Sequence, residues 1–136
     1  MTRLPPFTQV VETGIYVTDL EAAERFYCGI LSLRRVSSRA GRDLFLAAGR
    51  NMLLIFYAPE TLRGETLPAH GTRGPGHFAL EVESAADVEA WKRHLAEQRV
   101  TIEKETEWGQ PDLRSIYFRD PAGNSVEIIT RGVWPV

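Results

Sequence analysis

The 136-residue sequence has little of several features that mark specialised classes of protein. It has one cysteine, Cys28, so no disulfide can form within the chain, and we expect a reducing, cytoplasmic setting. Sixteen Lys and Arg residues against eighteen Asp and Glu give a net charge of −2. This balance does not predict the basic surface that binds nucleic acid or an anionic membrane.

Long apolar runs are also absent. The longest, MLLIFYA at residues 52–58, has the length of a strand and falls far short of the roughly 18 residues of a membrane span. The N-terminal MTRLPPFTQV has neither the apolar stretch nor the cleavage site of a secretory signal. With 43% hydrophobic and 25% charged residues, the sequence predicts a soluble globular protein of one domain or two small fused modules.

Apolar periodicity and turn signals predict one order of elements, strand, helix and three strands, in each half of the chain. In the first half the predicted elements cover residues 11–17, 19–30, 33–39, 42–48 and 51–58. In the second half they cover residues 77–83, 85–98, 100–108, 113–119 and 125–130. Between the halves, residues 59–76 are rich in Pro, Gly and Thr and predict an unusually long loop.

Both predicted helices begin with a capping-box pattern. Thr18 is followed three residues later by Glu21, and Ser84 is followed by Asp87. In such a box the hydroxyl and the carboxylate each accept a hydrogen bond from a free backbone N–H group. Thr18 and Ser84 are therefore the predicted N-caps.

The two halves are related residue by residue, which indicates an internal duplication. Val17 and Val82 end equivalent strands 65 residues apart, and Asn51 and Asn124 lie in equivalent hairpin turns 73 residues apart. We therefore predict an α+β fold of two tandem βαβββ modules within a single domain, residues 1–136. Module one covers about residues 8–58, a linker residues 59–75, and module two about residues 76–131.

The duplication relates His77 to Glu12, because the 65-residue offset places both at the start of equivalent strands. Glu127 lies among apolar residues of the last strand, where a carboxylate is costly to bury unless it is paired or bound to a cation. Two carboxylates and an imidazole on one face would suit Zn, Ni, Mn, Co or Fe(II) without discriminating among them. The alternative is a non-ligand histidine and solvent-facing glutamates on a half-exposed sheet.

Three segments resemble the vicinal oxygen chelate superfamily, which includes glyoxalase I, fosfomycin-resistance proteins, methylmalonyl-CoA epimerase, extradiol dioxygenases and bleomycin-resistance proteins. They are ETGIYVTDLEAAERFYCGILSL from Glu12, GHFALEVE from Gly76 and RSIYFRDPAGNSVEI from Arg114. The likeness covers roughly residues 8–131. It implies two βαβββ modules that form a curved mixed β-sheet around a cleft, in agreement with the order predicted above.

The resemblance also implies a set of metal ligands: Glu12, His77 and Glu127. Most members have histidine where this chain has Glu12, and some have a fourth ligand at the position of Leu54 or, with a shifted gap, Ile55. Both residues are apolar, so three protein ligands would leave coordination positions open for water or substrate. Relatives of this size are usually homodimers, and in many of them two subunits complete each cleft. The C-terminal VWPV could contribute to such an interface.

In metal-dependent members the metal acts as a Lewis acid on a small substrate that is chelated through adjacent oxygens. The resemblance therefore implies glyoxalase-like lyase, isomerase or dioxygenase chemistry, with Glu12 and Tyr117 as catalytic residues and Glu12 as either ligand or base. The residues expected to contact substrate are Tyr16, Trp108, Arg114 and Tyr117. His70, in the long loop, is expected to be solvated.

Two other interpretations stay open. One is a metal-free ligand-binding protein of the bleomycin-resistance type, favoured by the missing first histidine and fourth ligand. The other is a small accessory protein without catalysis. Few Lys or Arg residues lie near the last strands, which disfavours a strongly cationic phosphonate pocket.

Overall fold

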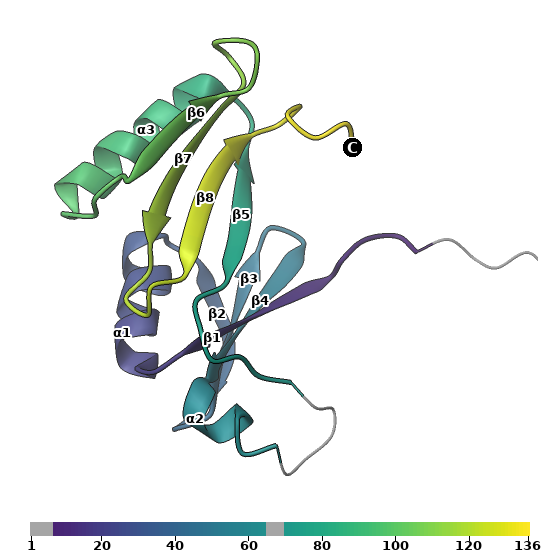
Figure 1. The fold of residues 1–136 in the computed structure, drawn as a ribbon, viewed down its shortest axis with the longest axis vertical. Coiled ribbons are helices and arrows are strands. Elements are labelled where there is room, and N and C mark those ends of the chain that lie inside the picture. Colours follow the sequence, from purple (N-terminus) through teal and green to yellow (C-terminus); the bar gives the residue numbers. More distant parts are fainter. Residues whose placement is uncertain (1–6, 65–69) are drawn as a thin grey trace, which may run out of the picture.

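The computed structural model describes residues 7–64 and 70–136 and has two βαβββ modules in tandem (Figure 1). Module one contains β1 (Glu12–Val17), α1 (Leu20–Glu24), the π-helix η1 (Arg25–Ile30), β2 (Arg34–Arg39), β3 (Asp43–Ala48) and β4 (Asn51–Tyr57). A one-turn helix, α2 (Ala58–Thr61), follows. Module two contains β5 (His77–Val82), α3 (Ala85–Glu97), β6 (Lys104–Glu107), β7 (Arg114–Arg119) and β8 (Ser125–Thr130).

The strands form two separate four-stranded sheets with the same topology, in the orders β1-β4-β3-β2 and β5-β8-β7-β6. In each sheet the first strand pairs in parallel with the last, and the other pairs are antiparallel. Glu12 pairs with Met52, and the corresponding residues His77 and Ser125 pair in the second sheet. This match confirms the predicted α+β class, the tandem modules and the duplication.

The first helix differs from its prediction in both its start and its winding. Asp19, not Thr18, is the N-cap, and its carboxylate accepts a hydrogen bond from the Ala22 N–H at 3.0 Å. The predicted Thr18 capping box is therefore wrong. After one turn the α-helix becomes η1, in which the adjacent residues Phe26 and Tyr27 are both buried. The Leu31 N–H donates to the Phe26 oxygen at 3.0 Å, the i+5 bond of a π-turn.

The second helix begins as predicted. The Ser84 hydroxyl accepts a hydrogen bond from the Asp87 N–H, and the Asp87 carboxylate accepts one from the Ser84 N–H. The strand predicted at residues 100–108 is shorter than expected, since only Lys104–Glu107 pairs with β7. Val100 and Ile102 instead pack against the hydrophobic core from the segment before it.

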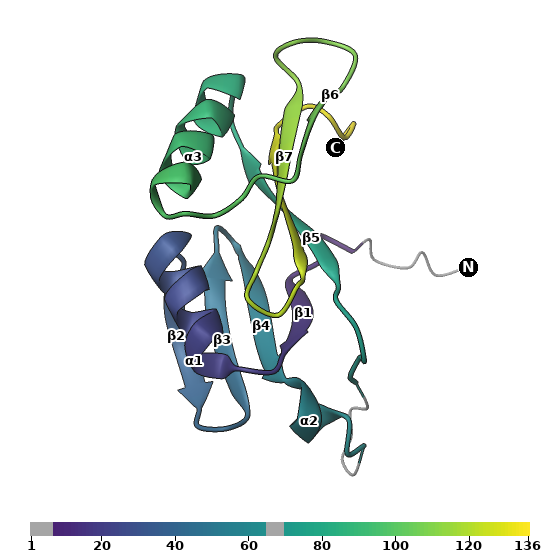
Figure 2. The same ribbon diagram turned by 60° about the vertical axis from the view of Figure 1, so that its left-hand side comes forward.

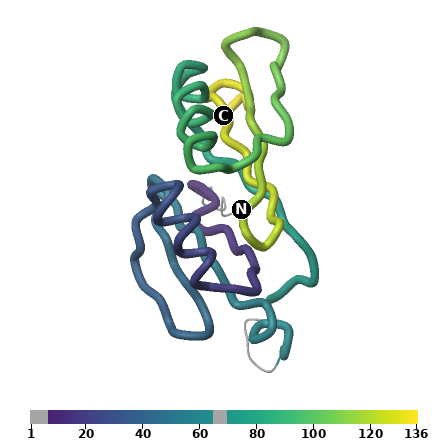
Figure 3. The backbone as a smooth tube through the Cα atoms, turned by 90° about the vertical axis from the view of Figure 1, so that its left-hand side faces the viewer, coloured from purple at the N-terminus to yellow at the C-terminus, as the bar shows by residue number. Residues whose placement is uncertain are grey.

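The helical segment formed by α1 and η1 and the helix α3 lie on the same side of the molecule, each against its own sheet (Figures 2 and 3). The two modules meet there, with His94 Nε2 on α3 2.9 Å from the backbone carbonyl oxygen of Ile30 at the end of η1. The buried core contains apolar residues from both helical segments and the sheet faces that they cover. Within residues 7–64 and 70–136, no helix covers the opposite face of either sheet (Figures 2 and 3).

Buried polar contacts join the turn between β7 and β8 to module one. The Tyr27 hydroxyl donates to Asp120 Oδ2 at 2.8 Å, and Asn124 Nδ2 donates to the backbone oxygen of Tyr16 at 3.2 Å. Asn124 Oδ1 also accepts from the Gly76 N–H at 2.7 Å. The DPAGN turn therefore connects the modules as well as closing a hairpin. Among the described residues, no helix is long and apolar enough to span a membrane.

Candidate functional site

The candidate site lies on the face of the second sheet that α3 does not cover. Side chains alternate across a strand, and Ile116, Phe118 and Ile128 are buried on the helix side. Tyr117 and Glu127, which are cross-strand partners, therefore lie together on the open face. His77 enters the same face from the start of β5.

His77 and Glu127 are in direct contact, with His77 Nε2 3.3 Å from Glu127 Oε1. The His77 side chain is 51% exposed, whereas the Glu127 side chain is 8% exposed. On the other side of the ring, Nδ1 lies 3.2 Å from both the backbone oxygen and the hydroxyl of Ser125. The contacts of Nδ1 with Ser125 orient the ring so that Nε2 faces Glu127.

The other oxygen of Glu127 is held by a second pair of side chains. The Ser115 hydroxyl donates to Glu127 Oε2 at 2.5 Å and accepts from Trp108 Nε1 at 2.8 Å. Trp108 is thus placed beside the site through Ser115, with 41% of its surface exposed. Sequence reasoning missed Ser115, although its position two residues before Tyr117 on the same strand places it on the same face.

Tyr117 stacks near His77, with ring centroids 6.3 Å apart and an interplanar angle of 28°. Burial, and then the neighbouring Glu127 carboxylate, raise the pKa of the Tyr117 hydroxyl above its ordinary value of 10.0. The hydroxyl therefore stays protonated near neutral pH and can donate a hydrogen bond. Lys104, which the sequence did not single out, lies with its Nζ 5.8 Å from the centroid of the Tyr117 ring.

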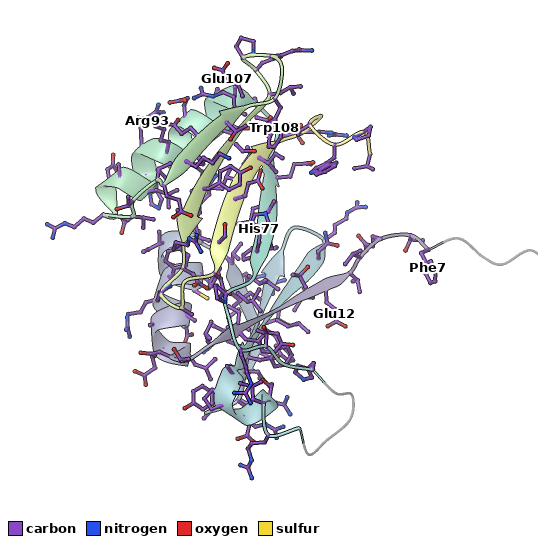
Figure 4. The ribbon with its side chains drawn as sticks, viewed as in Figure 1. Phe7, Glu12, His77, Arg93, Glu107 and Trp108 are labelled. Carbon is purple, nitrogen blue, oxygen red and sulfur yellow. The ribbon has the colours of Figure 1, made fainter. Side chains whose placement is uncertain are left out.

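Glu12 lies apart from this cluster, on the exposed start of β1 in the other module (Figure 4). The register confirms that it corresponds to His77, and it also identifies the residue of the first sheet that corresponds to Glu127. Ala79 pairs with Glu127 in the second sheet, and the corresponding Gly14 pairs with Leu54 in the first. Leu54, rather than Ile55, is therefore the counterpart of Glu127.

The open face of the first sheet is aromatic. The Tyr16 hydroxyl is 2.9 Å from His70 Nδ1, and the Phe56 ring lies 5.7 Å from the Tyr16 ring and 4.4 Å from the His70 ring. Phe45 meets Phe56 edge-on at 5.7 Å. Burial raises the pKa of Tyr16. His70 is exposed, as expected, and its ring also contacts Tyr16 and Phe56, which its position in a Gly/Pro-rich loop gave no means of predicting.

Arg114 lies on the opposite face of β7 from Tyr117, by the alternation of the strand. Its guanidinium forms ion pairs with Glu89 of α3 at 2.6 Å and with Glu105 of β6 at 3.5 Å. These contacts attach α3 to its sheet and direct the charge away from His77 and Glu127. Arg114 is consequently placed with the helix and not with the candidate site.

Within one chain, His77 and Glu127 supply two potential metal ligands, which do not make a complete metal site. Two ligands about 2.1 Å from one ion, at angles of about 90–110°, are separated by about 3.0–3.4 Å. The 3.3 Å between His77 Nε2 and Glu127 Oε1 fits this separation. Within residues 7–64 and 70–136 of a single chain, however, no group of three His, Cys, Asp or Glu side chains could hold a metal ion. The pair therefore fits a metal, provided that a third ligand comes from elsewhere.

A cavity of about 670 Å³ opens beside β5, between the modules. Apolar side chains such as Leu53, Leu80 and Trp91 line much of it, and neither His77 nor Glu127 contributes to its lining. This cavity is therefore distinct from the face that bears the histidine–carboxylate pair.

Comparison with protein-family models gives a match over residues 9–128 to the Glyoxalase/Bleomycin resistance protein/Dioxygenase superfamily. The chain belongs to this superfamily. The match spans both modules and includes Glu12, His77 and Glu127, so it covers the candidate site as well as the fold. A search of curated proteins found no match.

Solved structures agree with this membership. The chain is 35% identical to a lactoylglutathione lyase from Agrobacterium tumefaciens, with a TM-score of 0.90 and coverage of 97% of this chain and 100% of that one. A glyoxalase/bleomycin resistance protein/dioxygenase from Nocardioides is 20% identical, with a TM-score of 0.73 and coverage of 98% and 91%. An integron cassette protein from V. cholerae is 24% identical, with a TM-score of 0.73 and coverage of 96% and 100%. The latter two support the fold alone.

Proposed function

We propose that the protein is a divalent-metal-dependent enzyme that acts on a small substrate chelated through adjacent oxygens. In this proposal His77 and Glu127 of one chain and Glu12 of the partner subunit form the metal site of a homodimer. The observation that supports it most is the contact between a half-exposed imidazole and a buried carboxylate, at a spacing that suits two ligands of one ion.

The exposure of both open sheet faces supports a site shared between subunits. Glu12 is exposed on one sheet and His77 on the other, and the two do not meet within the chain. Exposed apolar side chains lie near both ends of the chain: Phe7, Val10, Val11 and Trp134. Residues 7–11, before β1, project from the body of the molecule (Figure 4). A second copy that covered these groups could bring the aromatic face of one chain onto the polar face of the other.

When bound, the metal would supply Lewis acidity that polarises a carbonyl oxygen of the substrate. The chain's own groups would do the remaining work. Tyr117, protonated near neutral pH, would donate a hydrogen bond to an oxygen on which negative charge develops. Glu12 of the partner subunit would serve as a ligand or as the base that removes a proton next to the carbonyl. Trp108 and Tyr16 would line the substrate region.

Lyase chemistry of the glyoxalase kind is favoured by the 35% identity to a protein named lactoylglutathione lyase. The apolar Leu54 at the counterpart of Glu127 separates this chain from sites with four protein ligands. A site with three protein ligands leaves more positions open, which also accommodates isomerase or dioxygenase reactions.

Metal content measured together with assembly state tests the proposal. Protein purified without chelators should contain about one equivalent of Zn, Ni, Mn, Co or Fe per chain, and light scattering should give the mass of a dimer. His77→Ala and Glu127→Gln should each lose the metal and keep the dimer, whereas Glu81→Gln, on the same strand as His77, should keep both. Protein without metal that retains none of these ions on reconstitution would exclude the proposed enzyme.

The aromatic face of module one supports a second candidate, a metal-free protein that binds a small ligand. Tyr16, Phe45, Phe56 and His70 form a cluster suited to stacking against a flat ligand. This candidate predicts the opposite metal result, together with thermal stabilisation by an aromatic ligand that is unchanged in Glu127→Gln.

A further inference from the structure

Four side chains form a row across the open face of the second sheet. Lys104 of β6 pairs with Tyr117 of β7, Tyr117 pairs with Glu127 of β8, and Glu127 pairs with Ala79 of β5. The ammonium of Lys104 lies over the Tyr117 ring, 5.8 Å from its centroid. A cation therefore lies on the same face as the proposed metal ligands, two strands from Glu127 and three strands from His77.

Lys104 differs from the other cations nearby because no ion pair neutralises it within the described part of the chain. Arg119 donates to Glu103 at 2.7 Å and to the Gly123 carbonyl oxygen at 2.9 Å. Lys92, the chain's other lysine, lies on the helix side and pairs with Glu105 at 2.8 Å. The positive charge of Lys104 thus remains available on the open face.

The charges of the site favour an anion at this position. Glu127 and Glu12 of the partner subunit would together neutralise a divalent cation, which would leave Lys104 without a counter-charge in this row. Tyr117 lies between Lys104 and Glu127 in the row, as the cross-strand partner of both. Lys104 is exposed, and an ammonium binds carboxylates and phosphonates through charge-assisted hydrogen bonds.

We propose that Lys104 binds an anionic group, a carboxylate or phosphonate, that the substrate bears at a distance from its chelating oxygens. The inference rests on the proposed metal-dependent function and adds a substrate class to it. Lys104 Nζ lies 5.8 Å from the Tyr117 ring, whose centroid is 6.3 Å from that of His77. These two distances place the ammonium within about 12 Å of the centroid of the His77 ring, which sets an upper limit on the span between the two groups.

Calorimetry with matched probes tests this inference. The protein is first titrated with Ni²⁺ alone, and the loaded protein is then titrated at low salt with three hydroxamic acids. One is acetohydroxamic acid, and the other two bear a carboxylate or a phosphonate at the far end of a short chain. The wild type should bind one of the charged probes about tenfold more tightly than acetohydroxamic acid, and the preferred probe identifies the anion.

The variants separate a role of Lys104 from general effects of charge. Lys104→Gln should lose the preference while keeping its Ni²⁺ affinity and its affinity for acetohydroxamic acid, and Lys104→Arg should retain most of the preference. Lys92→Gln is the matched control, because it removes the same charge from the opposite side of the sheet and should behave as the wild type.

The possible failures are distinguishable. Normal Ni²⁺ binding with equal affinity for all three probes, or with a preference that survives Lys104→Gln, would overturn the role of Lys104 and leave the proposed function standing. Absence of Ni²⁺ binding by the wild type would overturn both.

Discussion

At the scale of single residues, Glu127 is the group on which the site depends. It is 6% exposed, yet each of its carboxylate oxygens has a polar neighbour, Ser115 on one side and His77 on the other. A buried carboxylate is tolerated only when it is paired in this way or bound to a cation. Ser115 fixes one oxygen and so directs the other toward His77, as the outer-shell partners of metal ligands do.

Ser115→Ala should therefore weaken metal binding without unfolding the protein. We expect the affinity for Ni²⁺ to fall by about 10–100-fold, because Glu127 Oε2 and Trp108 Nε1 both lose their partner. Titration calorimetry measures the change. Trp108→Phe, which leaves the Ser115 hydroxyl in place, should have a smaller effect, and Ser38→Ala on the exposed strand β2 should have none. Unchanged affinity in Ser115→Ala would show that Glu127 needs no such support.

Tyr27 predicts a pH dependence of stability. Burial, followed by the charge of Asp120 and its hydrogen bond, raises the pKa of the Tyr27 hydroxyl well above 10.0 in the folded state. The folded protein therefore holds this proton more tightly than the unfolded chain. The corresponding stability is fully present below about pH 10 and is lost as the pH rises above that value.

Urea denaturation between pH 7 and pH 11 tests the role of Tyr27. Tyr27→Phe should lower the free energy of unfolding by about 1.5–3 kcal/mol at pH 7 and should flatten the decline above about pH 10. Tyr57→Phe is the control, because the Tyr57 hydroxyl has no hydrogen bond in the part of the chain that the structure describes. A decline of equal steepness in Tyr27→Phe would assign it to other groups.

At the scale of elements, local patterns predicted the strands and helices well and their ends less well. Period-2 alternation and turn residues predicted β8 at its observed bounds, since both are local signals. The π-turn in η1 was not predictable from helical periodicity, because apolar spacing does not indicate the i+5 hydrogen bond between Leu31 and Phe26. The strand predicted at residues 100–108 was longer than the observed β6, Lys104–Glu107. Val100 and Ile102 are apolar like strand residues, but they pack against the core without joining the sheet.

The start of α1 gives a direct test at this scale. Asp19→Ala should lower the free energy of unfolding by about 0.5–2 kcal/mol, because the Ala22 N–H loses its capping carboxylate. Thr18→Ala, at the N-cap expected from the sequence, should change it by less than about 0.5 kcal/mol. Chemical denaturation of the two variants decides between the caps, and the reverse order would restore the Thr18 capping box.

At the scale of the whole molecule, the duplication predicted which residues correspond but not which of them meet. Counting along the sequence related His77 to Glu12 correctly, as the strand registers show. It could not show that the two lie on sheets that do not join within one chain, because that depends on how the modules pack. The contact between His77 and Glu127 follows from β5 pairing with β8, whereas a contact with Glu12 requires a second chain.

A heterodimer of two variants, each of which lacks one proposed metal ligand, tests the shared site most directly. Glu12→Ala and His77→Ala chains would carry different affinity tags and would be mixed so that the dimers exchange subunits. The heterodimer would then be purified through both tags. If each site combines Glu12 of one chain with His77 and Glu127 of the other, one site of the heterodimer has all three ligands. It should then bind one equivalent of Ni²⁺ with wild-type affinity, whereas neither parent homodimer binds Ni²⁺ tightly. A heterodimer that binds no better than its parents would contradict the account.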